Sequence, residues 1–391
     1  MADVFMNTYH RLPVNFARGE GAWLFDTGGK KYLDFSSGIA VNCLGHAYPP
    51  LVKAIAEQAA RLNHVCNYYQ SDVSAAFAEK LMAACAPAGM KRVFLANSGA
   101  EANEGAIKIA RKYSLLRHGA NRHRIVTLRG SFHGRTVTTL SATGQDLFHK
   151  DFGPFTEGFS YIPAGDMDAL DKALDGDTVA GFLVEAVQGE SGVRPLEREY
   201  IERAAGLCAE RDILLLFDEI QCGMGRTGSF LACEAYGLKP DVVTLAKGLA
   251  GGIPVGAVLA GDKAADVLQV GDHGSTFGGN PIAAAAGLVV LDTVNRKPFL
   301  DEIVRKGEKL RSIILGWKHP KVKEVRGRGL MAAADIEDEA WPLLERALAG
   351  AATPGLLMLS AGKNTLRFLP PYIISDAELE QGLEILRGLL G

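Results

Sequence analysis

The sequence lacks the features that mark membrane, nucleic-acid-binding or disordered proteins. Its apolar runs are short and interrupted by glycine or charge, so none reaches the roughly 20 residues needed to span a bilayer. Its start has no basic segment followed by an apolar run, so no signal peptide is expected. The net charge is -3 without a basic block, which argues against nucleic acid as the main partner. With 48% hydrophobic and 22% charged residues, the composition is that of a globular protein.

Cysteine is scarce and scattered. The six cysteines form no CxxC pair and follow no regular spacing, so neither a zinc site nor a disulfide framework is expected. They are Cys43, Cys66, Cys85, Cys208, Cys222 and Cys233. Free thiols in a reducing compartment are the simplest interpretation. These absences together predict a cytoplasmic protein without a membrane partner.

Internal repeats and low-complexity linkers are also absent, yet the 391 residues exceed one typical domain. The middle of the chain alternates short apolar runs with helical stretches, which predicts an α/β fold with a mostly parallel sheet covered on both faces. We expect strands at residues 92–97, 124–130, 181–187, 213–220, 241–247 and 254–261. We expect helices at residues 50–62, 75–85, 100–117 and 198–211.

The two ends of the chain follow other patterns. Near the start, two alternating segments flank Asp-Thr-Gly-Gly at residues 26–29, which predicts a hairpin. The C-terminal part predicts helices at 282–295, 301–317 and 376–390 and strands near 322–336 and 365–371. We therefore expect a large central domain, residues 51–280. A smaller α+β domain is expected to combine residues 1–50 with residues 281–391.

A lone lysine stands between an apolar strand and a glycine-rich turn in DVVTLAKGLAGG. In the simpler interpretation, Lys247 ends a strand and reaches water, because a buried unpaired lysine is costly. In the alternative, Lys247 is a desolvated nucleophile that can form a Schiff base. The residues around it do not decide between the two.

Two other segments bear on that choice. ILLLFDEI brings Asp218 and Glu219 to the carboxyl end of a strand, where open α/β sheets bind ligands. No histidine cluster or third acid lies near, so a metal site is not expected. An acid can instead keep a pyridine nitrogen protonated. Ser98, Gly99 and Ala100 begin a helix and form either an anion site or an ordinary serine N-cap. An anion site, an acid and a lysine together indicate pyridoxal 5′-phosphate (PLP).

Three loops allow further interpretations. In GSFHGRT, Phe132 or His133 could stack on a flat ring and Arg135 could bind a carboxylate, although each could be an ordinary loop residue. HGSTFGGNP suits close approach to a phosphate or is simply a turn. GMGRTG, residues 223–228, matches the G-x-G-x-x-G motif of dinucleotide-binding proteins. Several residues separate it from the preceding apolar run, and the next strand ends in Lys247 rather than an acid, so a nucleotide-dependent oxidoreductase is disfavoured.

The sequence resembles the class III aminotransferases of PLP fold type I over essentially its whole length. Nine motifs carry the resemblance, in the right order: NTYHRLPVNFARGEGAWLFDTGGKKYLDF, GIAVNCLGH, NSGAEANEGAIKIAR, SFHGRT, VEAVQGESG, LLLFDEIQCGMGRTG, TLAKGLAGGIPVGA, STFGGNP and LRFLPP. The resemblance implies a large domain with a mostly parallel central sheet plus a smaller α+β domain. It also implies PLP as the cofactor.

The resemblance also implies roles for individual residues. Lys247 and Asp218 would be catalytic: Lys247 would bind PLP covalently and shuttle a proton, and Asp218 would pair with the pyridine nitrogen. The implied cofactor contacts are Ser98, Gly99, Ala100, Phe132, His133, Asp218, Gln221, Lys247 and Thr276. The implied substrate contacts are Arg135, Arg367, Glu190, Ile39 and Ser275, with Glu190 as the partner of Arg367. Because Thr276 would complete the phosphate site of a neighbouring subunit, a homodimer with active sites at the interface is expected.

Within the family, the similarity implies transfer of the terminal amino group of N2-acetylornithine to 2-oxoglutarate, a step of arginine biosynthesis. Ile39 stands where ornithine aminotransferases carry a tyrosine that contacts a free α-amino group, which disfavours free ornithine. Ala186 stands where relatives often have proline. Sister aminotransferases acting on succinylornithine, N-succinyl-diaminopimelate, ornithine or 4-aminobutyrate remain alternatives. A non-catalytic binding protein of the same fold is another.

Overall fold

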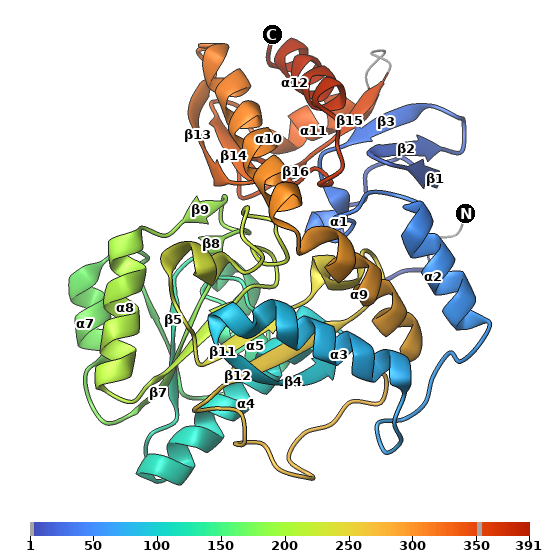
Figure 1. Ribbon diagram of the computed structural model, residues 1–391. Helices are drawn as coiled ribbons and strands as arrows, with labels where there is room; N and C mark the ends of the chain where they lie inside the picture. Colours follow the sequence, from blue (N-terminus) through green and yellow to red (C-terminus); the bar gives the residue numbers. More distant parts are fainter. Residues whose placement is uncertain (1–3, 350–353) are drawn as a thin grey trace.

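A seven-stranded sheet forms the centre of the protein in the computed structural model, which describes residues 4–349 and 354–391 (Figure 1). In spatial order the strands are β4 (Met90–Ala96), β12 (Gly256–Gly261), β11 (Val242–Leu245), β10 (Leu214–Asp218), β7 (Val179–Val184), β5 (Arg124–Leu128) and β6 (Phe159–Ile162). The pairs from β11 to β6 are parallel, whereas β12 is antiparallel to both of its neighbours. The prediction of a mostly parallel sheet is confirmed.

Helices cover both faces of this sheet. Successive side chains of a strand point to opposite faces, so Leu215 and Phe217 enter one apolar cluster while Leu214 and Leu216 enter another. The helices around the sheet are α2 (Pro49–Ala59), α3 (Asp72–Cys85), α4 (Gly99–His118), α5 (Val137–Ala142), α6 (Asp146–His149), α7 (Met167–Leu174), α8 (Arg198–Glu210) and α9 (Pro281–Val294). Burial on both faces explains why the central strands are nearly continuous apolar runs.

Two four-stranded sheets and three helices form most of the remaining described part of the chain. One sheet has the order β1 (Phe16–Glu20), β2 (Trp23–Asp26), β3 (Lys31–Asp34) and β15 (Gly355–Leu357). The other has the order β13 (Val322–Arg328), β14 (Met331–Ile336), β17 (Thr365–Phe368) and β16 (Leu359–Ser360). The helices are α10 (Lys297–Gly316), α11 (Ala340–Ala349) and α12 (Asp376–Leu390).

Parallel pairing of β3 with β15 joins the N-terminal and C-terminal parts of the chain, and these two strands lie side by side at the upper right of Figure 1. Leu33 and Phe35 pack in one apolar cluster with Leu356 and Leu379. The predicted hairpin is present, because β2 and β3 are antiparallel across residues 27–30. The domain boundaries near residues 50 and 280 stay a prediction; α9 contributes its side chains to the larger apolar cluster.

Short elements connect the larger ones near the site. They are a left-handed turn α1 (Ser37–Ala40), the strands β8 (Val187–Gln188) and β9 (Arg194–Pro195), and the 3-10 turns η1 (Ala86–Ala88), η2 (Ala232–Tyr236) and η3 (Lys247–Ala250). The expected strand 181–187 is therefore broken, because β7 ends at Val184 and β8 begins at Val187. Within residues 4–349 and 354–391, no helix is long and apolar enough to cross a membrane.

The GMGRTG segment has a packing role in this fold. A Cβ on Gly225 would lie 2.7 Å from a Val294 methyl group, and one on Gly228 would lie 2.3 Å from Val304. Arg226 between them is fully buried, and its Nη1 donates to the carbonyl oxygens of Leu330 and Pro370. The glycines thus allow this segment to pack closely against the C-terminal part of the chain.

Candidate active site

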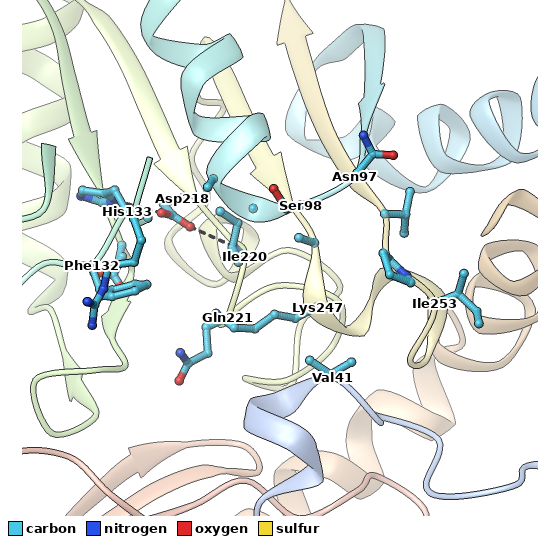
Figure 2. A pocket seen from close by; sticks show the side chains of 18 of the residues that line it. Val41, Asn97, Ser98, Phe132, His133, Asp218, Ile220, Gln221, Lys247 and Ile253 are labelled. Carbon is cyan, nitrogen blue, oxygen red and sulfur yellow. Dashed lines mark hydrogen bonds and ion pairs between the residues drawn. The ribbon is translucent and has the colours of Figure 1, made fainter. Parts of the chain in front are cut away.

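A cavity of about 460 Å³ lies at the carboxyl ends of β10 and β11, within the usual volume range for small-molecule sites of roughly 300–1,000 Å³. Because these strands are parallel neighbours, Asp218 and the Lys247 turn reach the same edge of the sheet. Most of the predicted cofactor contacts line this one cavity: Ser98, Gly99, Ala100, Phe132, His133, Asp218, Gln221 and Lys247. Figure 2 shows the Lys247 side chain extending into it.

Lys247 has an unusual backbone for a lysine. Its φ is 44°, in the left-handed region that residues with a side chain rarely adopt. Strained backbones of this kind tend to occur where a side chain has to be aimed at a site. Burial lowers the pKa of the Lys247 ammonium below its ordinary value, against the opposing effect of the Asp218 and Glu185 carboxylates. A lowered pKa leaves more of the amine neutral and therefore nucleophilic.

Asp218 is held by three donors from three parts of the chain. Its Oδ2 accepts from the Asn103 side-chain amide at 2.7 Å and from His133 Nδ1 at 2.8 Å. Its Oδ1 accepts from the backbone N–H of Ile220 at 3.0 Å, the contact dashed in Figure 2. An ionised carboxylate only accepts hydrogen bonds, so the proton of this contact lies on His133 Nδ1. This network fixes the carboxylate at the cavity wall.

Two polar atoms at the cavity have no partner within the described part of the chain. Gln221 Oε1 and His133 Nε2 are both buried without a hydrogen bond there. Buried polar groups are normally satisfied, so orphaned ones at a cavity indicate a ligand or water that pairs with them. Both atoms are acceptors when the His133 proton lies on Nδ1, so a ligand with a hydrogen-bond donor fits them, and the ring hydroxyl of PLP is such a donor.

The start of α4 provides the anion end of the cavity. Ser98 is the N-cap, and its hydroxyl accepts from the Glu101 N–H at 3.1 Å. The first N–H groups of a helix have no partner inside it, so those of Gly99 and Ala100 are suited to bind a phosphate. A Cβ on Gly256 would lie 2.3 Å from the Ser98 carbonyl oxygen. Glycine at the start of β12 therefore lets this turn approach the sheet.

Phe132 and Arg135 lie on the loop after β5. The backbone N–H of Phe132 donates to Glu185 Oε1 at 2.9 Å. Arg135 is exposed, and its guanidinium carbon lies 3.7 Å from the centre of the Phe148 ring. Within the described part of the chain no acidic side chain forms an ion pair with Arg135, so its guanidinium is available to a substrate carboxylate.

Arg367 and Glu190 form the ion pair that the resemblance implied. Arg367 Nη1 lies 2.9 Å from Glu190 Oε2 and also donates to the carbonyl oxygen of Gly189 at 3.0 Å. The Arg367 side chain is buried, and its Nε has no partner within residues 4–349 and 354–391. This arginine therefore retains an unused donor for a second carboxylate.

Five of the predicted residues are not among those that line the cavity around Lys247: the paired Glu190 and Arg367, and also Ile39, Ser275 and Thr276. Ser275 and Thr276 line a separate cavity of about 960 Å³, where the Ser275 hydroxyl accepts from Asn97 Nδ2 at 2.9 Å. Thr276 is exposed. Ile39 is 43% exposed on the left-handed turn α1, whose neighbour Val41 does line the Lys247 cavity. The roles given to these residues stay predictions.

Sequence reasoning missed two residues of the site, Asn103 and Glu185. Asn103 is fully buried on α4, and besides Asp218 it contacts the Thr244 hydroxyl at 2.8 Å. The signal was a polar residue on the same helix face as Ala102, Ala106 and Ile107. Glu185 directly follows β7, so the signal there was an acid after a fully apolar strand.

Comparisons with known proteins agree with this geometry. The family model for aminotransferase class-III matches residues 4–390. The acetylornithine aminotransferase of Caldanaerobacter subterraneus is 45% identical, covering 98% of this chain and 96% of the relative. That of Haemophilus ducreyi is 46% identical, covering 100% and 97%.

Solved structures give the same result. The ornithine aminotransferase from Toxoplasma gondii superposes with a TM-score of 0.93 at 33% identity, covering 99% of this chain and 92% of that one. The N-acetylornithine aminotransferase from Stenotrophomonas maltophilia has a TM-score of 0.84 at 39% identity, covering 98% and 96%. The chain therefore belongs to the class III aminotransferases, which use PLP to transfer amino groups.

Proposed function

We propose that this protein transfers the terminal amino group of N2-acetylornithine to 2-oxoglutarate, giving N-acetylglutamate 5-semialdehyde and glutamate. The observation that carries the proposal is the 43–46% identity, over nearly the whole chain, to several acetylornithine aminotransferases. The ornithine aminotransferase structures are less similar in sequence, at 31–33% identity. The substrate assignment follows the nearer group.

PLP, when bound, supplies an electron sink that stabilises negative charge on the carbon losing a proton. In our proposal, Lys247 holds the cofactor covalently and, once released, moves the proton at that carbon. Asp218, fixed by His133 and Asn103, keeps the ring nitrogen protonated. The helix start at Ser98 holds the phosphate, and Phe132 and Gln221 contact the ring.

The two arginines allow one pocket to accept two kinds of substrate. N2-acetylornithine reacts through its terminal amine and carries one distant carboxylate, whereas glutamate reacts through its α-amine and carries two. In our proposal Arg135, which has no acidic partner within the described residues, takes the distant carboxylate of either substrate. Arg367 stays paired with Glu190 for the first substrate and is released to bind the α-carboxylate of glutamate.

Glu190→Ala should therefore impair one half-reaction more than the other. Without Glu190, the buried Arg367 faces the acetylornithine side chain unpaired, so we expect KM for N2-acetylornithine to rise about tenfold. KM for glutamate should change by less than about threefold, because that substrate displaces Glu190 in any case. Steady-state kinetics with each amine measure both values. Equal losses for the two substrates would contradict the switch at Arg367.

The substrate assignment is tested with a panel of amines at fixed 2-oxoglutarate. The panel contains N2-acetylornithine, succinylornithine, N-succinyl-diaminopimelate, ornithine and 4-aminobutyrate, and glutamate formation is followed. We expect kcat/KM for N2-acetylornithine to exceed those for ornithine and 4-aminobutyrate by at least about tenfold. A higher kcat/KM for another amine of the panel would reassign the substrate to that sister reaction.

We also propose that the enzyme works as a homodimer. Thr276 lines the 960 Å³ cavity together with Tyr68 and Val270, which are 96% and 107% exposed. Large apolar side chains exposed together are typical of a surface that another chain covers. In the dimer, Thr276 would reach the phosphate of the neighbouring subunit. The cytoplasmic location expected from the sequence stays a prediction.

A further inference from the structure

Glu185 connects two loops of the active site through its two carboxylate oxygens. Its Oε1 accepts the backbone N–H of Phe132 at 2.9 Å, and its Oε2 accepts that of Gly189 at 3.3 Å. The residue is 5% exposed and lies on the cavity wall between β7 and β8. A single side chain therefore holds both the loop with the ring-contacting Phe132 and the loop that leads to Glu190.

The second loop carries this connection to the substrate side. Gly189 directly precedes Glu190, and the Gly189 carbonyl oxygen accepts from Arg367 Nη1 at 3.0 Å. The same Nη1 lies 2.9 Å from Glu190. Phe132, Glu185, Gly189 and Arg367 thus form one continuous chain of hydrogen bonds. It runs from the cofactor side of the cavity to the Glu190–Arg367 pair.

A carboxylate at this position is costly, which argues that its two contacts matter. Burial raises the pKa of the Glu185 carboxyl to about 7, with a further rise from Asp218 and an opposing effect of His133 and the two amides. An apolar residue would avoid this cost but would leave two buried N–H groups unpaired. Because both oxygens already face backbone amides, the geometry favours positioning over proton transfer.

We propose that Glu185 is a positioning residue that couples the placement of Phe132 to that of the Glu190–Arg367 pair, and so helps to set the preference between substrates with one and with two carboxylates. The proposal rests on the proposed function, because it concerns the same switch at Arg367. It adds a residue outside the set of ligand contacts, acting through backbone amides alone.

Glu185→Gln tests the coupling in the holoenzyme. The amide keeps one acceptor oxygen, but its NH₂ group faces the other backbone N–H, so one of the two loops loses its hydrogen bond. If Gly189 is released, Glu190 holds Arg367 less firmly. Binding of a dicarboxylate should then be favoured over binding of a monocarboxylate. A lost anchor should also alter how Phe132 lies against the cofactor ring.

Two equilibrium measurements read out these effects without turnover. Glutarate and pentanoate have five carbons and no amine, so calorimetry gives their Kd values for the holoenzyme without reaction. We expect Kd(glutarate)/Kd(pentanoate) to fall about fivefold in Glu185→Gln, the change expected for one lost hydrogen bond. The visible circular dichroism of the bound cofactor should change in the same variant.

Glu219→Gln is the matched control. Glu219 is also fully buried, also has a pKa raised by burial to about 7, and also accepts two backbone N–H groups, those of Ala232 and Cys233. It holds neither Phe132 nor Gly189. We expect it to lower the thermal midpoint while leaving the Kd ratio within about twofold. If Glu185→Gln does not fold, Glu185→Asp keeps both acceptors one methylene shorter and should shift the ratio in the same direction.

The outcomes separate the hypotheses. A changed ratio together with changed dichroism, in the Glu185 variant alone, supports the coupling. A ratio that stays constant, or a change in only one of the two readouts, overturns it, as does an equal effect of Glu219→Gln. The proposed function fails separately, if the unmodified holoenzyme transfers no amino group from any amine of the panel to 2-oxoglutarate.

Discussion

Lys247→Ala is expected to abolish transamination, lowering kcat by at least about four orders of magnitude. The variant loses the Lys247 amine, whose pKa is lowered by burial. No other lysine lines this cavity within the described part of the chain. Both the covalent hold on the cofactor and the proton transfer depend on this amine in our proposal. The rate is measured as glutamate formed from N2-acetylornithine and 2-oxoglutarate.

A second measurement assigns the loss to Lys247 itself. Borohydride treatment followed by mass spectrometry should attach the cofactor to residue 247 in the unmodified protein and to no residue in the variant. Lys263→Ala is the control, because Lys263 is a surface lysine paired with Asp212 at 3.1 Å. It should keep full activity and labelling. If Lys247→Ala retained activity, the assignment of Lys247 as the catalytic amine would be wrong.

Asp218→Asn should lower kcat by about 10²- to 10³-fold while the protein still binds the cofactor. The substitution keeps the shape of the side chain but removes the charge that stabilises a protonated ring nitrogen. It also replaces one carboxylate oxygen by an NH₂ group among donors from Asn103, His133 and Ile220. Single-turnover kinetics measure the rate, and absorbance after dialysis measures retained cofactor.

Asp212→Asn provides the comparison for this effect. Asp212 precedes the same strand, β10, at its opposite end, and it also accepts several hydrogen bonds, from Tyr113, His118 and Lys263. It does not line the Lys247 cavity. We expect lower thermal stability and unchanged turnover. A rate in Asp218→Asn within about tenfold of the unmodified enzyme would show that the ring nitrogen does not depend on this carboxylate.

The central strands could be predicted because burial on both faces leaves a continuous apolar run in the sequence. That signal placed Asp218 at the end of β10, and the pairing of β10 with β11 then confirmed that Asp218 and Lys247 share a cavity. The antiparallel direction of β12 gives no such signal, since its six residues are buried like those of its parallel neighbours. Strand β6 was missed because most of its four residues are only half-buried.

The contacts that complete the site depend on tertiary structure. Arg367 and Glu190 are far apart in sequence, and only the resemblance to the family implied that they meet. Asn103 donates to Asp218, and Glu185 accepts from the backbone N–H groups of two loops. The fold brings these partners together, so spacing in the sequence cannot reveal them. A polar residue type within an apolar pattern indicates a buried polar side chain, but it does not show which groups that side chain contacts.

The pairing of β3 with β15 has a consequence for the order in which the protein forms during synthesis. β3 ends at Asp34, whereas its partner β15 starts at Gly355. The sheet of β1, β2 and β3 therefore stays incomplete until nearly the whole chain has been synthesised. The seven-stranded sheet, by contrast, has all its strands by Gly261. The cavity wall that carries Ser98, Asp218 and Lys247 can therefore form before Arg367 has been synthesised.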